Sequence, residues 1–178
     1  PAHLAMSLPP TMTFAEGASL VVTGLTAVAC VEEAARLRKG ESILIQSAAG
    51  ATGMALVQLA LHHGATVFGT ASAPEKLKRL RTLGVHHPIP YTQVDFVDAV
   101  REQTDGVDVI VDSLSGEAIT KGLGILRQGG RFIELGAGSA LEVPSIDPAA
   151  LFLRNQSFMG VNISQMMSEP ARLARLQD

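Results

Sequence analysis

The chain has 178 residues, of which 47% are hydrophobic and 17% charged, and this composition suits one compact domain with a sizeable buried core. The net charge of -3 provides no broad basic surface for nucleic acid or for an anionic membrane. The single cysteine, Cys30, excludes an internal disulfide, and its apolar neighbours indicate a packing role. The most apolar stretch, 18–31, is shorter than the roughly 20 residues that cross a bilayer, and no signal peptide is visible, so we expect a cytoplasmic protein.

The first part of the chain predicts a linker followed by a helix. Residues 1–12 are rich in proline and have no hydrophobic period, which is typical of a connecting segment that enters a domain. Thr13 and Glu16 have the spacing of a capping box, and the apolar run after them ends in charged residues and Gly40. We therefore expect a leading helix over 13–39, with Gly17 and Gly24 as points where it could break.

From Ser42 onward, short apolar runs alternate with longer helical ones. The runs predict strands over 43–46, 66–70, 87–91, 107–111, 131–135 and 157–162, and helices over 54–63, 74–83, 95–103, 117–126 and 148–154. Parallel neighbours need crossover connections, so this alternation indicates an α/β fold with a doubly wound parallel six-stranded sheet, the Rossmann fold, in the strand order 3-2-1-4-5-6. We expect this core over 42–162, the sixth strand at the sheet edge, and an exit segment over 163–178.

A glycine turn joins the first predicted strand to an apolar helix. In a dinucleotide site the middle glycine of such a turn lets the backbone approach the pyrophosphate, and the last lets helix and strand pack closely. Gly50 and Gly53 fill these two roles, while Ala48 stands where the fingerprint usually has its first glycine. The helix N-terminus would offer free N–H groups and partial positive charge to the phosphates. The strand-turn-helix context favours a dinucleotide site over a tight turn without a ligand.

The end of the second predicted strand distinguishes the two nicotinamide cofactors. An NAD site usually presents an acidic residue about 20 residues beyond the turn, to hold the ribose hydroxyls. Here the segment 68–76 has no acid before Glu75. Ser72 and Lys76 could instead donate to a 2′-phosphate, which favours NADPH over NADH. The alternative for Lys76 is an ordinary exposed lysine in the first turn of a helix.

Two other classes of site are disfavoured. The only tyrosine, Tyr91, is followed four residues later by Asp95, so the tyrosine-lysine pair of short-chain dehydrogenases is absent. Neighbouring histidines, at 62–63 and at 86–87, point in different directions on a helix or a strand, so neither pair forms a metal site by itself. We predict no metal.

Four segments, 36–45, 47–53, 112–117 and 129–136, together resemble the medium-chain dehydrogenase/reductases, and most of all the enoyl reductase domains of polyketide and fatty acid synthases. The resemblance covers nearly the whole chain. It implies NADPH-dependent reduction of the α,β double bond of an enoyl thioester on an acyl carrier protein, with hydride added at the β-carbon and a proton at the α-carbon. It also implies further synthase domains in the same polypeptide and a separate substrate domain that these residues lack, so the fragment alone should reduce little.

The resemblance also implies which residues bind the cofactor: Thr26 near the nicotinamide, Ala49, Gly50, Ala51, Thr52 and Gly53 under the pyrophosphate, Ser72, Lys76 and Tyr91 around the 2′-phosphate, and Leu114 and Gly136 after the fourth and fifth strands. Family members often carry a lysine just after this last position and an aspartate past the sixth strand, both proposed as proton donors. This chain has Ala137 and Ser164 there, so no catalytic residue is assigned. Asn162 could contact the nicotinamide or only end the strand as a turn former.

Two alternative functions stay open at this stage. The altered lysine and aspartate positions are compatible with a free-standing NADPH:quinone oxidoreductase, or with a catalytically degenerate domain kept as a scaffold. The predicted sixth strand is apolar, and an apolar edge strand can pair with a second copy, so a homodimer through it is a further hypothesis.

Overall fold

The computed structural model describes residues 8–114, 116–136 and 145–169. The elements follow in the order α1 Phe14–Val28, the π-helical turn η2 Ala29–Ala34, β1 Ser42–Ile45, α2 Ala51–His62, β2 Thr66–Ala71, α3 Pro74–Leu83, β3 His87–Pro90, α4 Phe96–Arg101, β4 Val107–Asp112, α5 Glu117–Ile125, β5 Leu126–Glu134, α6 Pro148–Leu153, β6 Ser157–Gly160 and α7 Ile163–Met167. Strands and helices alternate from β1 onward, as the sequence predicts.

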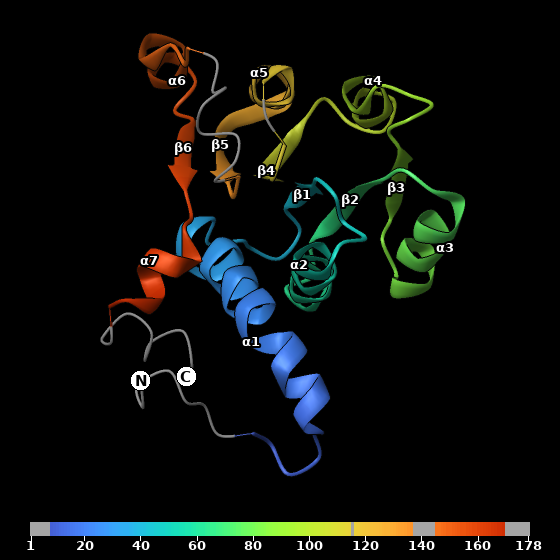
Figure 1. The fold of residues 1–178 in the computed structure, drawn as a ribbon. Helices are drawn as coiled ribbons and strands as arrows, with labels where there is room; N and C mark the ends of the chain where they lie inside the picture. Colours follow the sequence, from blue (N-terminus) through green and yellow to red (C-terminus); the bar gives the residue numbers. More distant parts are fainter. Residues whose placement is uncertain (1–7, 115, 137–144, 170–178) are drawn as a thin grey trace.

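The six strands form one parallel sheet in the order β3-β2-β1-β4-β5-β6 (Figure 1). This confirms the predicted Rossmann-type topology and places β6 at an edge. The main difference is β5, which begins at Leu126 rather than at Arg131. Leu126 pairs with Val107 before the register shifts, and its side chain is buried, so five residues expected in a helix end and a loop extend the strand instead.

Helices cover both faces of the sheet (Figure 1). Side chains alternate along a strand, so Ile43 and Ile45 of β1 pack on the side of η2 and α2, while Leu44 packs on the side of α4 and α5. All four residues of β1 are buried, as expected for a central parallel strand. The hydrophobic core therefore has two main layers, one on each side of the sheet, and a smaller third cluster joins α1 to α7 through Leu25, Ala29 and Met166.

The leading helix starts where the sequence predicts and ends earlier. The capping box is confirmed, because the Thr13 N–H donates to Glu16 Oε2 at 2.8 Å and Thr13 Oγ1 accepts from the Glu16 N–H. The helix continues through Gly17 and Gly24 without a break. It does not reach residue 39, because it passes into η2 and stops before Arg36, whose φ of 49° is left-handed.

The helical stretch Phe14–Ala34 is longer than the apolar run seen in the sequence. By length and composition alone these 21 residues could cross a membrane, a test that the core helix of a soluble protein also passes. Its second half is nevertheless part of the domain interior, because Ala27, Cys30 and Val31 belong to the larger core layer. Burial also raises the pKa of the Cys30 thiol to about 12, consistent with the packing role predicted for it.

Candidate functional site

The turn after β1 brings the start of α2 to the carboxyl end of the sheet. Ser47 takes a left-handed φ of 52°, and the Gly50 N–H donates to its carbonyl at 2.9 Å, which closes the turn. Gly50 is the N-cap of α2 and provides no side chain to cap it. The first N–H groups of an α-helix have no partner inside the helix, so the positive end of α2 is available to a ligand.

Two small residues allow this turn to pack so tightly. A Cβ on Gly53 would lie 2.7 Å from the Cα of Ala48, which explains the glycine at the third position of the fingerprint. Ala48 itself is fully buried, and a Cβ on Gly69 of β2 would lie 2.9 Å from its methyl carbon. The alanine at the first fingerprint position is therefore accommodated because Gly69, the residue of β2 that faces it, has no side chain.

Two cavities meet at the turn. The larger, about 720 Å³, falls within the size range of ligand pockets and is lined by Val22, Thr26, Gln46, Ser47, Gly50, Ala51, Thr52, Gly53, Leu56, Val111, Ser113, Glu134, Leu135, Gly136, Gly160, Val161, Asn162, Ile163 and Ser164. The smaller, about 110 Å³, is lined by Ser47, Ala49, Gly50, Thr70, Ala71, Ser72, Lys76 and Tyr91. Ser47 and Gly50 border both, so the cavities lie on the two sides of the α2 N-terminus.

The structure brings together nearly all the residues predicted from the sequence. Those of the larger cavity are Thr26, Gly50, Ala51, Thr52, Gly53 and Gly136. Those of the smaller cavity are Ala49, Gly50, Ser72, Lys76 and Tyr91. Leu114 is the exception, because it lines neither cavity and instead donates its N–H to Asp112 Oδ1 at 2.9 Å.

The smaller cavity offers donors for an anion. Lys76 is exposed in the first turn of α3, Ser72 follows β2, and Tyr91, which is half exposed, follows β3. The lining residues include an ammonium group, two serine hydroxyls and a phenol, but no carboxylate. Hydrogen bonds between such charged or polar donors and phosphate oxygens are among the stronger ones in proteins. The arrangement therefore suits a phosphate group held at the open end of the α2 turn.

The polar lining of the larger cavity consists of one carboxyl group, that of Glu134, together with hydroxyl and amide groups. Thr26 Oγ1 donates to the Val22 carbonyl at 2.6 Å, so its proton is held by its own helix. Asn162 caps α7, because its Oδ1 accepts from the N–H groups of Ser164 at 3.1 Å and Gln165 at 3.4 Å, which supports the turn-former interpretation. Ser164 does line this cavity, while Ala137 lies outside the described residues. The proton donor stays unassigned.

Sequence reasoning missed the residues that directly follow or end the strands: Gln46, Ser47, Val111, Ser113, Glu134, Leu135, Gly160, Val161 and Ile163, together with Val22 and Leu56 on α1 and α2. A general signal could have found most of them. In an open α/β sheet ligands bind outside the carboxyl ends of the strands, so every residue at those ends is a candidate.

Three of the described histidines have contacts that account for them structurally. His86 Nδ1 accepts the Val67 N–H at 3.1 Å, and the His87 ring stacks on Phe68 with centroids 4.3 Å apart. Burial lowers the pKa of His87, and the neighbouring His86 acts in the same direction. His63 Nε2 lies 3.1 Å from Glu32 Oε1. Among the residues that the structure describes, no three His, Cys, Asp or Glu side chains gather as a metal site would require.

Comparison with known proteins identifies the family. The family model described as zinc-binding dehydrogenase matches residues 51–177. The chain is 41% identical over 178 residues to a phenolphthiocerol/phthiocerol polyketide synthase of Mycobacterium tuberculosis, covering 98% of this chain and 8% of that synthase.

Comparison with solved structures gives relatives of the same kind. The nucleotide-binding subdomain of the enoylreductase domain of PpsC from Mycobacterium tuberculosis is 42% identical, with a TM-score of 0.81 and 88% of each chain covered. The quinone oxidoreductase from Thermus thermophilus, solved also with NADPH, is 32% identical, with a TM-score of 0.79 and coverage of 96% of this chain and 54% of that one.

The chain thus spans about half the length of such a reductase and 8% of the synthase. The family description mentions zinc, but the described residues do not fit a zinc site. The chain belongs to the zinc-binding dehydrogenase family of medium-chain dehydrogenase/reductases, and within it resembles the nucleotide-binding part of polyketide synthase enoyl reductases.

Proposed function

We propose that this chain is the NADPH-binding part of an enoyl reductase domain of a polyketide synthase. Such a domain reduces the α,β double bond of an enoyl thioester carried on an acyl carrier protein. The observation that carries the proposal is the pair of cavities joined at the α2 N-terminus. One of them is lined by side chains that can donate hydrogen bonds to a phosphate group. The 42% identity to an enoylreductase nucleotide-binding subdomain supports the same conclusion.

Each part of the site has a place in this proposal. The N–H groups of Ala51, Thr52 and Gly53 would hold the pyrophosphate, since they stand at the positive end of α2. Ser72, Lys76 and Tyr91 would hold the 2′-phosphate in the smaller cavity. The larger cavity would receive the nicotinamide between α1 and the ends of β4, β5 and β6. Bound NADPH would supply the hydride.

The remaining assignments concern the context of the chain. We propose that residues 1–178 form a single NADP-binding domain, with 1–12 entering it and 163–178 leaving it. The substrate domain and the other synthase domains would lie elsewhere in the same cytoplasmic polypeptide. The length of the relatives supports this view, because the chain matches 8% of the mycobacterial synthase.

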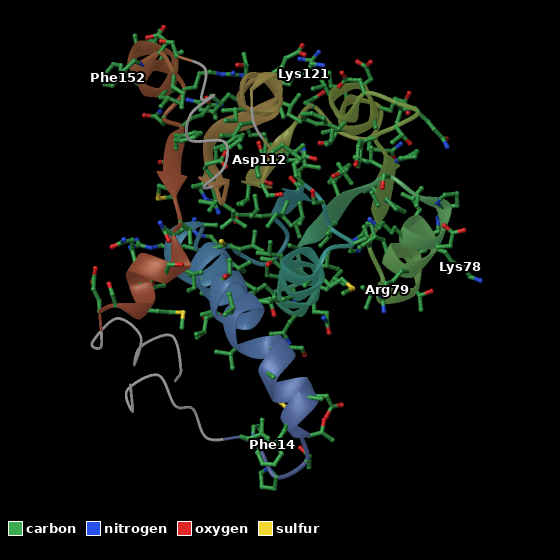
Figure 2. All side chains as sticks on the ribbon, in the orientation of Figure 1. Phe14, Lys78, Arg79, Asp112, Lys121 and Phe152 are labelled. Atoms are coloured by element: carbon green, nitrogen blue, oxygen red, sulfur yellow. The ribbon has the colours of Figure 1, made fainter. Side chains whose placement is uncertain are left out.

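Cofactor preference tests the proposal directly. Calorimetric titration of the chain should show NADPH binding at least about tenfold tighter than NADH, a difference of about 1.4 kcal/mol. Lys76→Ala should remove most of this preference by weakening NADPH alone. Lys78→Ala is the matched control, because Lys78 is exposed on the same helix, lines neither cavity and extends outward from α3 (Figure 2). Equal affinities for the two cofactors, or none, would contradict the proposal.

The second candidate is a quinone reductase, favoured by the 32% identity to the Thermus thermophilus enzyme. A two-domain protein that includes the substrate domain should be assayed with an enoyl thioester and with a quinone. NADPH oxidation with the thioester supports enoyl reduction, and oxidation with the quinone alone supports this second candidate. No oxidation with either would indicate a scaffold, the role that Ser164 in place of an aspartate leaves open.

A homodimer through β6 is a separate proposal. This strand lies at the sheet edge, and its neighbour α6 exposes Phe152 and Leu153. An apolar edge can pair with the same strand of a second copy. Sedimentation of the complete domain should then show a dimer, and a monomer at all concentrations would contradict the proposal.

A further inference from the structure

A row of polar side chains crosses the carboxyl end of the sheet. Asp112 of β4 is in register with Glu134 of β5. On the other side of β4, Gln46 continues β1, with its N–H donating to the Val111 carbonyl, and it accepts a hydrogen bond from Thr70 Oγ1 at 2.8 Å. Each of these four polar residues stands two positions after a core residue that packs under α4 and α5. Since side chains alternate along a strand, all four face that side of the sheet. The core residues are Phe68 before Thr70, Leu44 before Gln46, Ile110 before Asp112 and Phe132 before Glu134.

Three members of this row accept a backbone N–H from a loop that borders the cavities. Thr70 Oγ1 accepts from Ser47 at 2.9 Å, Asp112 Oδ1 accepts from Leu114 at 2.9 Å, and Glu134 Oε1 accepts from Gly136 at 2.6 Å. Ser47 and Gly136 line the larger cavity, and Leu114 follows Ser113, which also lines it. Each of the three loops is therefore held near its start by one of these side chains.

Asp112 is a buried carboxylate that does not have all its hydrogen bonds. It is 1% exposed, whereas Phe14 and Phe152, which are labelled with it in Figure 2, are 89% and 80% exposed. Its Oδ2 has no hydrogen-bond partner among the described residues, and burial raises the pKa of its carboxyl. Leaving such an atom unsatisfied lowers the stability of the folded state. A buried polar atom without a partner calls for an explanation beyond packing.

We propose that Thr70, Asp112 and Glu134 are positioning residues that fix the three loops around the cofactor. The inference rests on the proposed function, because it takes the two cavities to be the NADPH site. The side chains need not touch the ligand. By holding the N–H groups of Ser47, Leu114 and Gly136 they set how far each loop extends over the strand ends, and a shift of about 1 Å there weakens binding strongly.

Asp112→Leu and Asp112→Asn separate this role from simple packing. Leucine fills the space but removes the acceptor for the Leu114 N–H, whereas asparagine keeps one. We expect NADPH to bind about tenfold more weakly to Asp112→Leu, which is about 1.4 kcal/mol, and within about threefold of wild type to Asp112→Asn. Thr70→Val, which loses the acceptor for the Ser47 N–H, provides a second case in which the size of the side chain is kept. Calorimetry on the folded variants gives the affinities.

Asp108→Ala is the matched control. Asp108 lies at the opposite end of β4, where it accepts from the Ser42 N–H and hydroxyl and from Arg127. This variant should melt at a lower temperature with an unchanged NADPH affinity. If wild type binds NADPH but Asp112→Leu and Thr70→Val bind as tightly, the inference is overturned and the proposed function stands. If wild type binds no NADPH, both fail.

Discussion

The contact between Ala48 and Gly69 gives a sharp test of how the turn is built. A Cβ on Gly69 would lie 2.9 Å from the Ala48 methyl, 3.4 Å from Val85 Cγ1 and 3.5 Å from Leu80 Cδ1. Overpacking of this kind costs about 1–3 kcal/mol, so we expect Gly69→Ala to destabilise by about 2 kcal/mol. Ala48→Gly loses a buried methyl and adds freedom to the unfolded chain, together about 1.5 kcal/mol.

The double variant should be more stable than these losses suggest. Independent effects would add to about 3.5 kcal/mol, but the new methyl would occupy the space that the Ala48 methyl leaves, so we expect a loss of about 1.5 kcal/mol and a coupling of about 2 kcal/mol. Urea denaturation of the four proteins, followed by circular dichroism, measures this coupling. Gly69→Ala combined with the exposed Arg79→Ala should be additive. A double variant whose loss equals the sum within about 0.5 kcal/mol would refute the reasoning.

Three further outcomes are expected. Gly53→Ala should lose about 3 kcal/mol, more than Gly69→Ala, because its Cβ would lie 2.7 Å from backbone atoms of Ala48 that cannot move aside. Gly50→Ala meets only a carbonyl oxygen at 3.3 Å and should change stability little; equal losses in urea would contradict this. Burial lowers the pKa of His87 below 6.5, so the folded protein binds this proton less readily than the unfolded chain and loses stability as the pH falls. Between about pH 7.5 and about pH 5.5 the melting temperature of His87→Gln should therefore fall less than that of wild type. Equal falls in the two proteins would show the reasoning wrong. Arg131→Lys should cost about 1–2 kcal/mol, because lysine cannot replace the two bonds to Glu41 at 3.0 and 2.7 Å; an unchanged melting temperature would count against it.

The fold could be predicted from local patterns because each element carries its own signal. Alternating apolar runs define strands and helices, and parallel crossovers then leave a small number of topologies, one of which is the order observed. The ends of elements were harder to predict. The leading helix stops before Arg36 because of its left-handed backbone, and β5 starts at Leu126 because of a pairing with β4, and neither has a clear local signature.

The site could be predicted where it depends on one continuous segment. The turn from Ser47 to Gly53 and the end of β2 lie close together in the sequence, and their residues do line the cavities. The contribution of β6 and α7 arises from strand order, so only the family resemblance pointed to Asn162 and Ser164 there. Asp112 and Glu134 belong to the resembling segments, but their bonds to the following loops depend on the sheet register and became visible only in the structure.

The π-helical turn η2 sets the rotational phase of the leading helix. The Ala35 N–H bonds to the Cys30 carbonyl, five residues back instead of four, so this turn holds one residue more than an α-helical turn would. Each residue of an α-helix corresponds to about 100° of rotation. Deleting one residue here would let the segment wind regularly, but would turn α1 by that angle and carry Thr26 off the cavity wall. A change of length inside this buried helix would therefore act on the ligand site in a way that the same change in a surface loop would not.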